Sequence, residues 1–164
     1  MGMAKRTIRN PSTIEQWVLA HANVGRFLFN WAALEQSLHE AIETAFSLNP
    51  LCGAILVNNM QLRDKINILK TILDAYGHND APSLIKTLDA IGTYSAVRNM
   101  VAHEFHAAAG DSVRFYRMRA KGKFSIPETI WSDADFHAAY DKIDNFKTEI
   151  EKKKEAFNPP DLEI

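Results

Sequence analysis

Three polar side chains whose chemistry suits RNA cleavage stand within six residues of one another, in the segment RNMVAHEFHA. Arg98 carries a planar fork of donors that fits a phosphate, and His103 titrates near neutral pH, so that it can take up or give a proton. Asn99 can hold a hydroxyl group or fix the tautomer of an imidazole. Together these groups suffice for metal-free cleavage of RNA, because the histidine can activate the ribose 2′-hydroxyl while the arginine stabilises charge on the phosphate.

Helical geometry separates this arginine from this histidine. Val101 and Phe105 are expected to belong to the buried line of a helix, with Arg98 beside that line and His103 nearly opposite. At about 100° per residue the arginine and the histidine stand about 140° apart, whereas Asn99 and His103, four residues apart, are neighbours. One copy of the segment cannot easily bring both groups to a single atom unless the helix ends or distorts there. A second copy, facing the first across a two-fold axis, could supply the missing side. The spacing therefore predicts a site shared by two copies or no site at all.

The same segment holds groups that could bind a metal ion. His103, Glu104 and His106 are close in the sequence, and two histidines three apart on a helix could share a ligand. However, HEFH lacks the four-residue histidine separation of the zinc-protease motif, and Cys52 is the only cysteine of the chain. We therefore expect no metal and no cofactor, and we interpret Glu104 and His106 as bystanders.

A carboxylate interrupts the apolar stripe of an earlier helix. Glu35 falls between Trp31 and Leu38 at helical spacing, where a charge is costly unless it is paired or hydrogen-bonded. Lys65 borders the apolar stripe of the next helix and Arg98 that of the third, so either cation could pair with Glu35. In one interpretation Glu35 and Lys65 support the site by orienting its cation. In the other, the edge of the stripe reaches water.

A basic and aromatic segment follows the motif. Arg117, Arg119 and Lys121 share one face if the strand that holds them is regular. Such a patch could hold the backbone of RNA, with one of the interleaved aromatic side chains, Phe115, Tyr116 or Phe124, for stacking. The other interpretation is a charged face that protects the edge of a sheet.

Helical periodicity dominates the chain and sets the expected fold. The pattern predicts four main helices: residues 13 to about 48, 60–76, 80 to about 103, and 132 to about 150. Capping residues mark several of their ends, and LCGAILV between the first two reads as one or two helical turns. Residues 112–131 contain two β-branched and aromatic runs around Ala-Lys-Gly-Lys, which is typical of a β-hairpin. The expected fold is all-α: an antiparallel four-helix up-and-down bundle with a β-hairpin inserted before the last helix.

Length and composition indicate one ordinary globular domain. The 164 residues are 46% hydrophobic and 24% charged, with a net charge of −1, which excludes a globally basic coat for binding nucleic acid. We expect a flexible arm over residues 1–11, the bundle domain over 12–157 and a tail over 158–164. No signal peptide or membrane span is evident, and the single cysteine fits a reducing compartment, so we expect a cytoplasmic protein without a membrane partner.

RNMVAH, late in the third expected helix, resembles the signature of the HEPN superfamily (higher eukaryote and prokaryote nucleotide-binding domains). That signature is an arginine, then four to six residues of which the first is often Asn, Asp or His, and then a histidine. Arg98, Asn99 and His103 match it position by position. FNWAALEQSLHEAI with its glutamate and LRDKINIL with its Asp-Lys are similar to the first two helices of HEPN-like bacterial proteins. The resemblance covers most of the chain, whereas the hairpin is an elaboration.

The resemblance implies a homodimer with the motif helices facing each other and, in catalytic members, a metal-independent endoribonuclease of the toxin or phage-defence type. Arg98 and His103 would then be the catalytic pair, with Asn99 as polar helper and with RNA and an antitoxin protein as partners. Phe105 occupies the position where some HEPN toxins have a tyrosine that a partner nucleotidyltransferase modifies, so regulation by that route is not expected. Other relatives are non-catalytic modules that bind a nucleotide or a protein. No recognition of a DNA sequence is expected.

Overall fold

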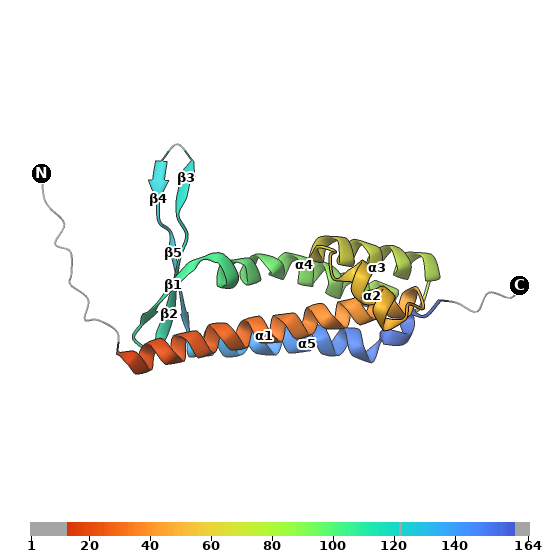
Figure 1. Ribbon diagram of the computed structural model, residues 1–164, viewed down its shortest axis with the longest axis horizontal. Helices are drawn as coiled ribbons and strands as arrows, with labels where there is room; N and C mark the ends of the chain where they lie inside the picture. Colours follow the sequence, from red (N-terminus) through yellow and green to blue (C-terminus); the bar gives the residue numbers. More distant parts are fainter. Residues whose placement is uncertain (1–12, 122, 160–164) are drawn as a thin grey trace, which may run out of the picture.

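The computed structural model describes residues 13–121 and 123–159, which are mostly helical with a small antiparallel sheet (Figure 1). The α-helices are α1 Ile14–Ala45, α2 Pro50–Val57, α3 Leu62–Tyr76, α4 Ala81–His103 and α5 Asp133–Lys152, and a 3-10 turn, η1 Lys154–Phe157, follows α5. The strands are β1 Phe105–Ala109, β2 Ser112–Tyr116, β3 Arg119–Lys121, β4 Lys123–Ser125 and β5 Glu128–Ser132. The arm expected over 1–11 and residues 160–164 of the expected tail lie outside the described residues. None of the described helices combines the length and the apolar character needed to cross a membrane.

The helices begin and end at the capping residues that the sequence indicates. Thr13 and Gln16 form a capping box at the start of α1, and Ser132 and Asp135 form another at the start of α5. Gly77 ends α3 in the left-handed conformation, with φ of 63°. These local signals fix where each helix starts and stops, so the predicted helical spans are confirmed to within a few residues.

The core lies between α1 and the helices that it contacts, which are α2, α3, α4 and α5. Figure 1 shows α1 and α5 running side by side along the molecule, with α4 above them and α2 and α3 at the end far from the sheet. The seven-residue spacing of α1 supplies the largest buried set: Ala20, Val24, Phe27, Trp31, Leu34, Leu38, Ala41 and Ala45. The period predicted for α1 is therefore the period that it buries.

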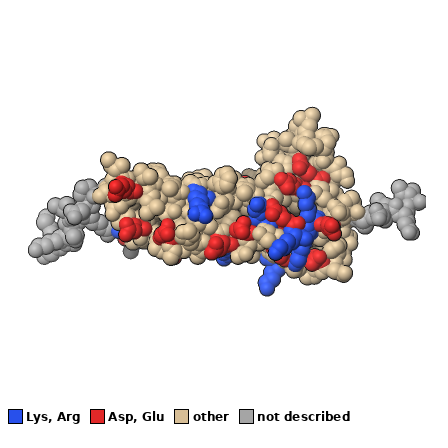
Figure 2. Space-filling model, turned by 90° about the horizontal axis from the view of Figure 1, so that it is seen from below, with Lys and Arg blue, Asp and Glu red and all other residues tan. Residues whose placement is uncertain are grey.

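Charged residues of both signs gather on the face formed by α1 and α5, at the end that lies far from the sheet (Figure 2). There Lys153 contacts Glu149, and Lys154 lies 3.8 Å from the carboxylate of Glu40. Exposed pairs of this kind contribute little to stability, typically about 0–1 kcal/mol each. Because these lysines are paired with glutamates, this end carries no strong patch of one sign.

The inserted β element is larger than the hairpin expected over residues 112–131. β1, β2 and β5 form a three-stranded antiparallel sheet in that order, and β3 and β4 form a separate two-stranded ribbon. The interpretation of Phe105 as a buried helical residue is wrong, because its side chain is 69% exposed at the start of β1. Gly110, with φ of 64°, reverses the chain between β1 and β2, so that Phe105 pairs with Tyr116.

The sheet has a packed inner face and an open outer face. Val113 and Phe115 are buried on the inner face, where the ring of Phe115 lies 5.9 Å from that of Trp131 and 6.3 Å from that of Phe136. Alternate residues of β2 point the other way. The sheet therefore docks on α1 and α5 through one face and presents the other beside the end of α4.

Candidate functional site

The last turns of α4 bring Arg98, Asn99 and His103 together within one chain. Arg98 Nη1 lies 3.3 Å from Asn99 Oδ1 and 3.3 Å from His103 Nε2. The expectation that one helix keeps the arginine away from the histidine is wrong. The angle around the helix describes where side chains start, but the long arginine side chain crosses it, and α4 ends at His103, where no later turn intervenes. A partner chain is therefore not needed to join these groups.

The contact with Arg98 involves the Nε2 atom of His103. A guanidinium can only donate, so as a hydrogen bond this contact requires His103 Nε2 to accept. The imidazole tautomer with its proton on Nδ1 fits that role. This is the form that a general base needs, but the lone pair becomes available to a substrate only when Arg98 moves aside.

The guanidinium of Arg98 contacts an amide and an imidazole, and no carboxylate among the described residues. Its Nη1 serves Asn99 and His103, while its Nε is buried without a hydrogen-bond partner in the described part of the chain. No ion pair joins Arg98 to a carboxylate among residues 13–121 and 123–159. The charge of Arg98 is thus left for an anion from outside.

Two surface clefts meet at Asn99. A groove of about 860 Å³ is lined by residues of α1, α3 and α4, among them Glu35, Arg98 and Asn99. A second cleft of about 720 Å³ is lined by Asn99, His103 and Tyr116, together with other residues from the end of α4 and the sheet. Arg98 thus lines the first cleft and His103 the second, while Asn99 lines both. An elongated anion lying over Asn99 could reach both groups.

Glu35 finds its partner on its own helix. Its Oε1 accepts a hydrogen bond of 2.6 Å from Trp31 Nε1, and the side chain is half-buried in the groove that Arg98 also lines. Lys65 is buried on α3, and no ion pair links Glu35 to Lys65 or to Arg98 among the described residues. The tryptophan one turn earlier satisfies the carboxylate, so the expected pairing with a cation is wrong.

The basic residues after the motif do not share one regular strand. Arg117 lies between β2 and β3, is 59% exposed and stands 3.6 Å from Glu104 Oε1. Arg119 and Lys121 belong to β3, opposite Ser125 and Lys123, and their side chains lie outside the described residues. The condition for a common face, one regular strand through all three residues, is therefore not met, because β2 ends at Tyr116 and Arg117 lies before β3. Glu104 is also more than a bystander, since it holds Arg117 beside the His103 cleft.

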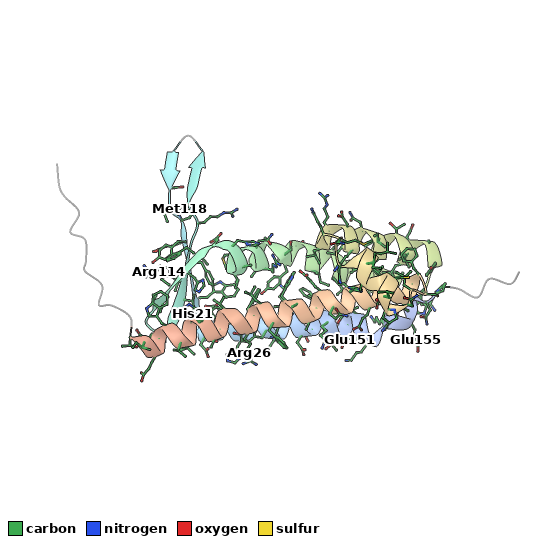
Figure 3. The ribbon with its side chains drawn as sticks, in the orientation of Figure 1. His21, Arg26, Arg114, Met118, Glu151 and Glu155 are labelled. Atoms are coloured by element: carbon green, nitrogen blue, oxygen red, sulfur yellow. The ribbon has the colours of Figure 1, made fainter. Side chains whose placement is uncertain are left out.

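A histidine and tryptophan cluster beside the site was missed. His21 lies where α1 meets the sheet (Figure 3), and its ring centroid is 5.6 Å from that of Trp17 and 5.3 Å from that of His106. These residues and His103 line a cleft of about 550 Å³. Burial, and to a smaller extent the nearby charge of His21, lowers the pKa of His106. His21 and His106 are far apart in the sequence. Their contact could be predicted only if Phe105–Ala109 were first identified as a strand that packs on α1.

The described residues contain no group of three or more His, Cys, Asp and Glu side chains placed to hold a metal ion. The site is thus described by the guanidinium, amide and imidazole at the end of α4. No protein-family model matches the chain, and comparisons with curated proteins and with solved structures found no match.

Proposed function

We propose that the protein is a metal-independent endoribonuclease of the HEPN type, in which Arg98, Asn99 and His103 act on a phosphodiester bond of RNA. One observation carries the proposal: a guanidinium without a carboxylate partner among the described residues lies 3.3 Å from an imidazole nitrogen, beside the two clefts that Asn99 lines. An anion binder and a base in contact are the two groups that this reaction needs.

In the proposed reaction His103 Nε2 takes the proton of a ribose 2′-hydroxyl. The 2′-oxygen forms a bond to phosphorus, and the bond from phosphorus to the 5′-oxygen of the next nucleotide breaks. The proton on His103 then passes to that 5′-oxygen, which leaves a 2′,3′-cyclic phosphate on one product and a 5′-hydroxyl on the other. Arg98 moves from His103 to a phosphate oxygen, where it stabilises the developing charge, and Asn99 orients the hydroxyl.

The proposal includes a homodimer in which the ends of two α4 helices face each other across one cleft. While Arg98 of one chain contacts His103, its Nη1 is occupied by Asn99 and His103 and its Nε is buried, so only Nη2 is open to a phosphate. A second Arg98 across a two-fold axis would supply further donors. In this proposal α1, α3, α4 and α5 form the HEPN-type up-and-down bundle. A cytoplasmic toxin or defence role and an antitoxin partner belong to the same proposal.

The test is RNA cleavage by His103→Ala, with His137→Ala as the matched control. His137 is an exposed histidine on α5 that lies 3.4 Å from Asp133, away from the clefts at the end of α4. Loss of the base should lower the rate of cleavage by about 10²–10⁴-fold, with unchanged circular dichroism and melting temperature. His137→Ala should cleave like the wild type. Cleavage that survives in His103→Ala would overturn the proposal.

The contact between Arg98 and His103 also favours a second function. Because Arg98 occupies the Nε2 lone pair, the same clefts suit a non-catalytic module that binds a nucleotide or a protein through the guanidinium. Such a module would bind a nucleotide saturably, lose that binding in Arg98→Ala, and cleave no RNA. Isothermal titration calorimetry beside the cleavage assay separates the two functions.

A further inference from the structure

An apolar cleft opens on the outer face of the sheet, directly beside the cleft that holds His103. Its volume is about 320 Å³, and its lining is Phe105, Ala107, Tyr116, Met118 and Ile126. Phe105, Tyr116 and Met118 also line the His103 cleft. The two clefts are therefore neighbours that share three lining side chains, so a ligand at His103 lies next to the apolar cleft.

The apolar cleft is built from large side chains that the core does not use. Phe105 is 69% exposed, Met118 76% and Ile126 50%, although water contact with such surfaces is unfavourable. The cross-strand register sets Phe105 opposite Tyr116, and their ring centroids lie 6.1 Å apart. Phe115, which points to the inner face, is fully buried. The outer aromatic pair is thus a surface that remains open while the core is already filled.

We propose that this cleft binds an unpaired nucleobase of the RNA strand whose phosphate lies at Arg98 and His103, so that the substrate is single-stranded RNA. This inference rests on the proposed function and deepens it. An aromatic side chain gives a base a stacking surface without requiring one particular sequence. Phe105 follows His103 by two residues and lines the same cleft, which places the stacking surface beside the proposed general base. In a duplex the bases are already stacked and paired, so they cannot enter the cleft.

The charge at the mouth of the cleft favours a nucleic-acid strand over an apolar protein segment. Arg117 lines the His103 cleft beside Tyr116 and Met118 and is 59% exposed. Its only described ionic partner, Glu104, lies 3.6 Å away. A chain that alternates flat bases with phosphates matches this alternation of aromatic and cationic groups. A protein helix or strand would bring further apolar side chains to a cleft whose neighbour is lined by Arg117 and His103.

The experiment compares Phe105→Leu with Phe29→Leu in the full-length protein. Phe29 is 74% exposed on α1, so the control removes an equally exposed ring away from the site. The substrates are single-site RNA oligonucleotides with either natural nucleotides or one abasic nucleotide next to the scissile bond. We expect Phe105→Leu to lower kcat/KM by about five- to hundredfold on natural RNA. With the wild type, kcat/KM should fall by the same factor when the abasic RNA replaces the natural RNA. Phe105→Leu should lower kcat/KM on the abasic RNA no further. Phe29→Leu should match the wild type.

A binding readout separates this inference from the proposed function. RNA with 2-aminopurine next to the scissile bond is titrated with the full-length His103→Ala chain, with and without Phe105→Leu. Stacking quenches the fluorescence, and we expect Phe105→Leu to abolish the quenching. If the wild type cleaves RNA but neither the abasic nucleotide nor Phe105→Leu has an effect, the base site is overturned while the proposed function stands. If no RNA is cleaved but quenching depends on Phe105, the base site stands and the proposed function fails. A cleft that takes a protein segment predicts neither effect, which also overturns the base site.

Discussion

Two arginines of this chain have a buried Nε atom without a hydrogen-bond partner among the described residues, yet their surroundings differ. Arg114, on the sheet (Figure 3), is 9% exposed, and its Nη1 lies 3.2 Å from Glu128 Oε2 on the neighbouring strand. Arg98 contacts the amide of Asn99 and the imidazole of His103, beside the two clefts that Asn99 lines. A carboxylate neutralises the first cation and makes it part of the sheet. The second keeps its charge available for a ligand.

Of the two arginines, Arg98 is expected to give the larger effect on cleavage when it is replaced by alanine. Removing the guanidinium should lower RNA cleavage by about 10²–10³-fold, because charge on the phosphate in the transition state loses its donor. Stability should change by less than about 1 kcal/mol, since both partners of Arg98 are exposed and can bind water instead. Cleavage assays and urea denaturation on the same preparations measure the two quantities. A variant that unfolds readily but cleaves normally would reverse the roles of the two arginines.

Arg114→Met should show the opposite pattern. It leaves Glu128 without its cation and should lower the free energy of unfolding by about 2 kcal/mol, less than for a fully buried pair, because the Glu128 side chain is 44% exposed. Cleavage by the folded fraction should stay near that of the wild type. Replacing both partners, in Arg114→Met with Glu128→Leu, should recover part of the stability. Equal destabilisation by the single and double variants would show that the ion pair is not the cause.

Mixing two inactive variants tests how the facing Arg98 residues of the proposed homodimer are used. A heterodimer of Arg98→Ala and His103→Ala chains retains one arginine and one histidine on opposite sides of the cleft. We expect such mixtures, after denaturation and refolding together, to cleave RNA faster than either variant alone. The same protocol with each variant mixed with itself is the control. Mixtures as inactive as their components would restrict the reaction to the contact within one chain.

The smallest expected effect is on the pH dependence of stability, and it comes from His106 on the inner face of β1. His103, by contrast, is exposed. The pKa of His106 is lowered from its ordinary 6.5, chiefly by burial, so the unfolded chain takes up a proton there more readily than the folded one. Stability should therefore fall as pH drops below 6.5 through the lowered pKa. In urea denaturation at pH 5.5 and 7.5, His106→Phe should show a smaller loss towards acid than the wild type. An equal loss in both proteins would contradict this assignment.

The helices could be predicted from the sequence because two independent signals agree there. The apolar period of α1 matches its buried face, and Thr13, Gly77 and Ser132 mark helix ends by local hydrogen bonds or backbone conformation. The first strand of the sheet was missed. Phe105–Ala109 is rich in alanine, which is depleted in strands, although Gly110-Asp111 is a two-residue turn signal before the run SVRFY.

The contact between Arg98 and His103 could not be derived from an ideal helix. The projection around the axis treats side chains as short spokes, whereas arginine is long and His103 sits at the last helical position. The partner of Glu35 was not predicted for a different reason. Trp31 on the same helix supplies a hydrogen-bond donor, so the carboxylate needs no cation. Residue types thus indicated the candidate site, while its connections depended on side-chain reach.

The most direct test of the central claim is the chemical nature of the cleavage products in the presence of a metal chelator. A short RNA that the wild type cleaves at one bond is digested in EDTA, and both fragments are analysed by mass spectrometry. Attack by the 2′-hydroxyl through His103 and Arg98 predicts one fragment with a 2′,3′-cyclic phosphate and one with a 5′-hydroxyl. Fragments with a 5′-phosphate and a 3′-hydroxyl, or cleavage that stops when EDTA is added, would contradict the account.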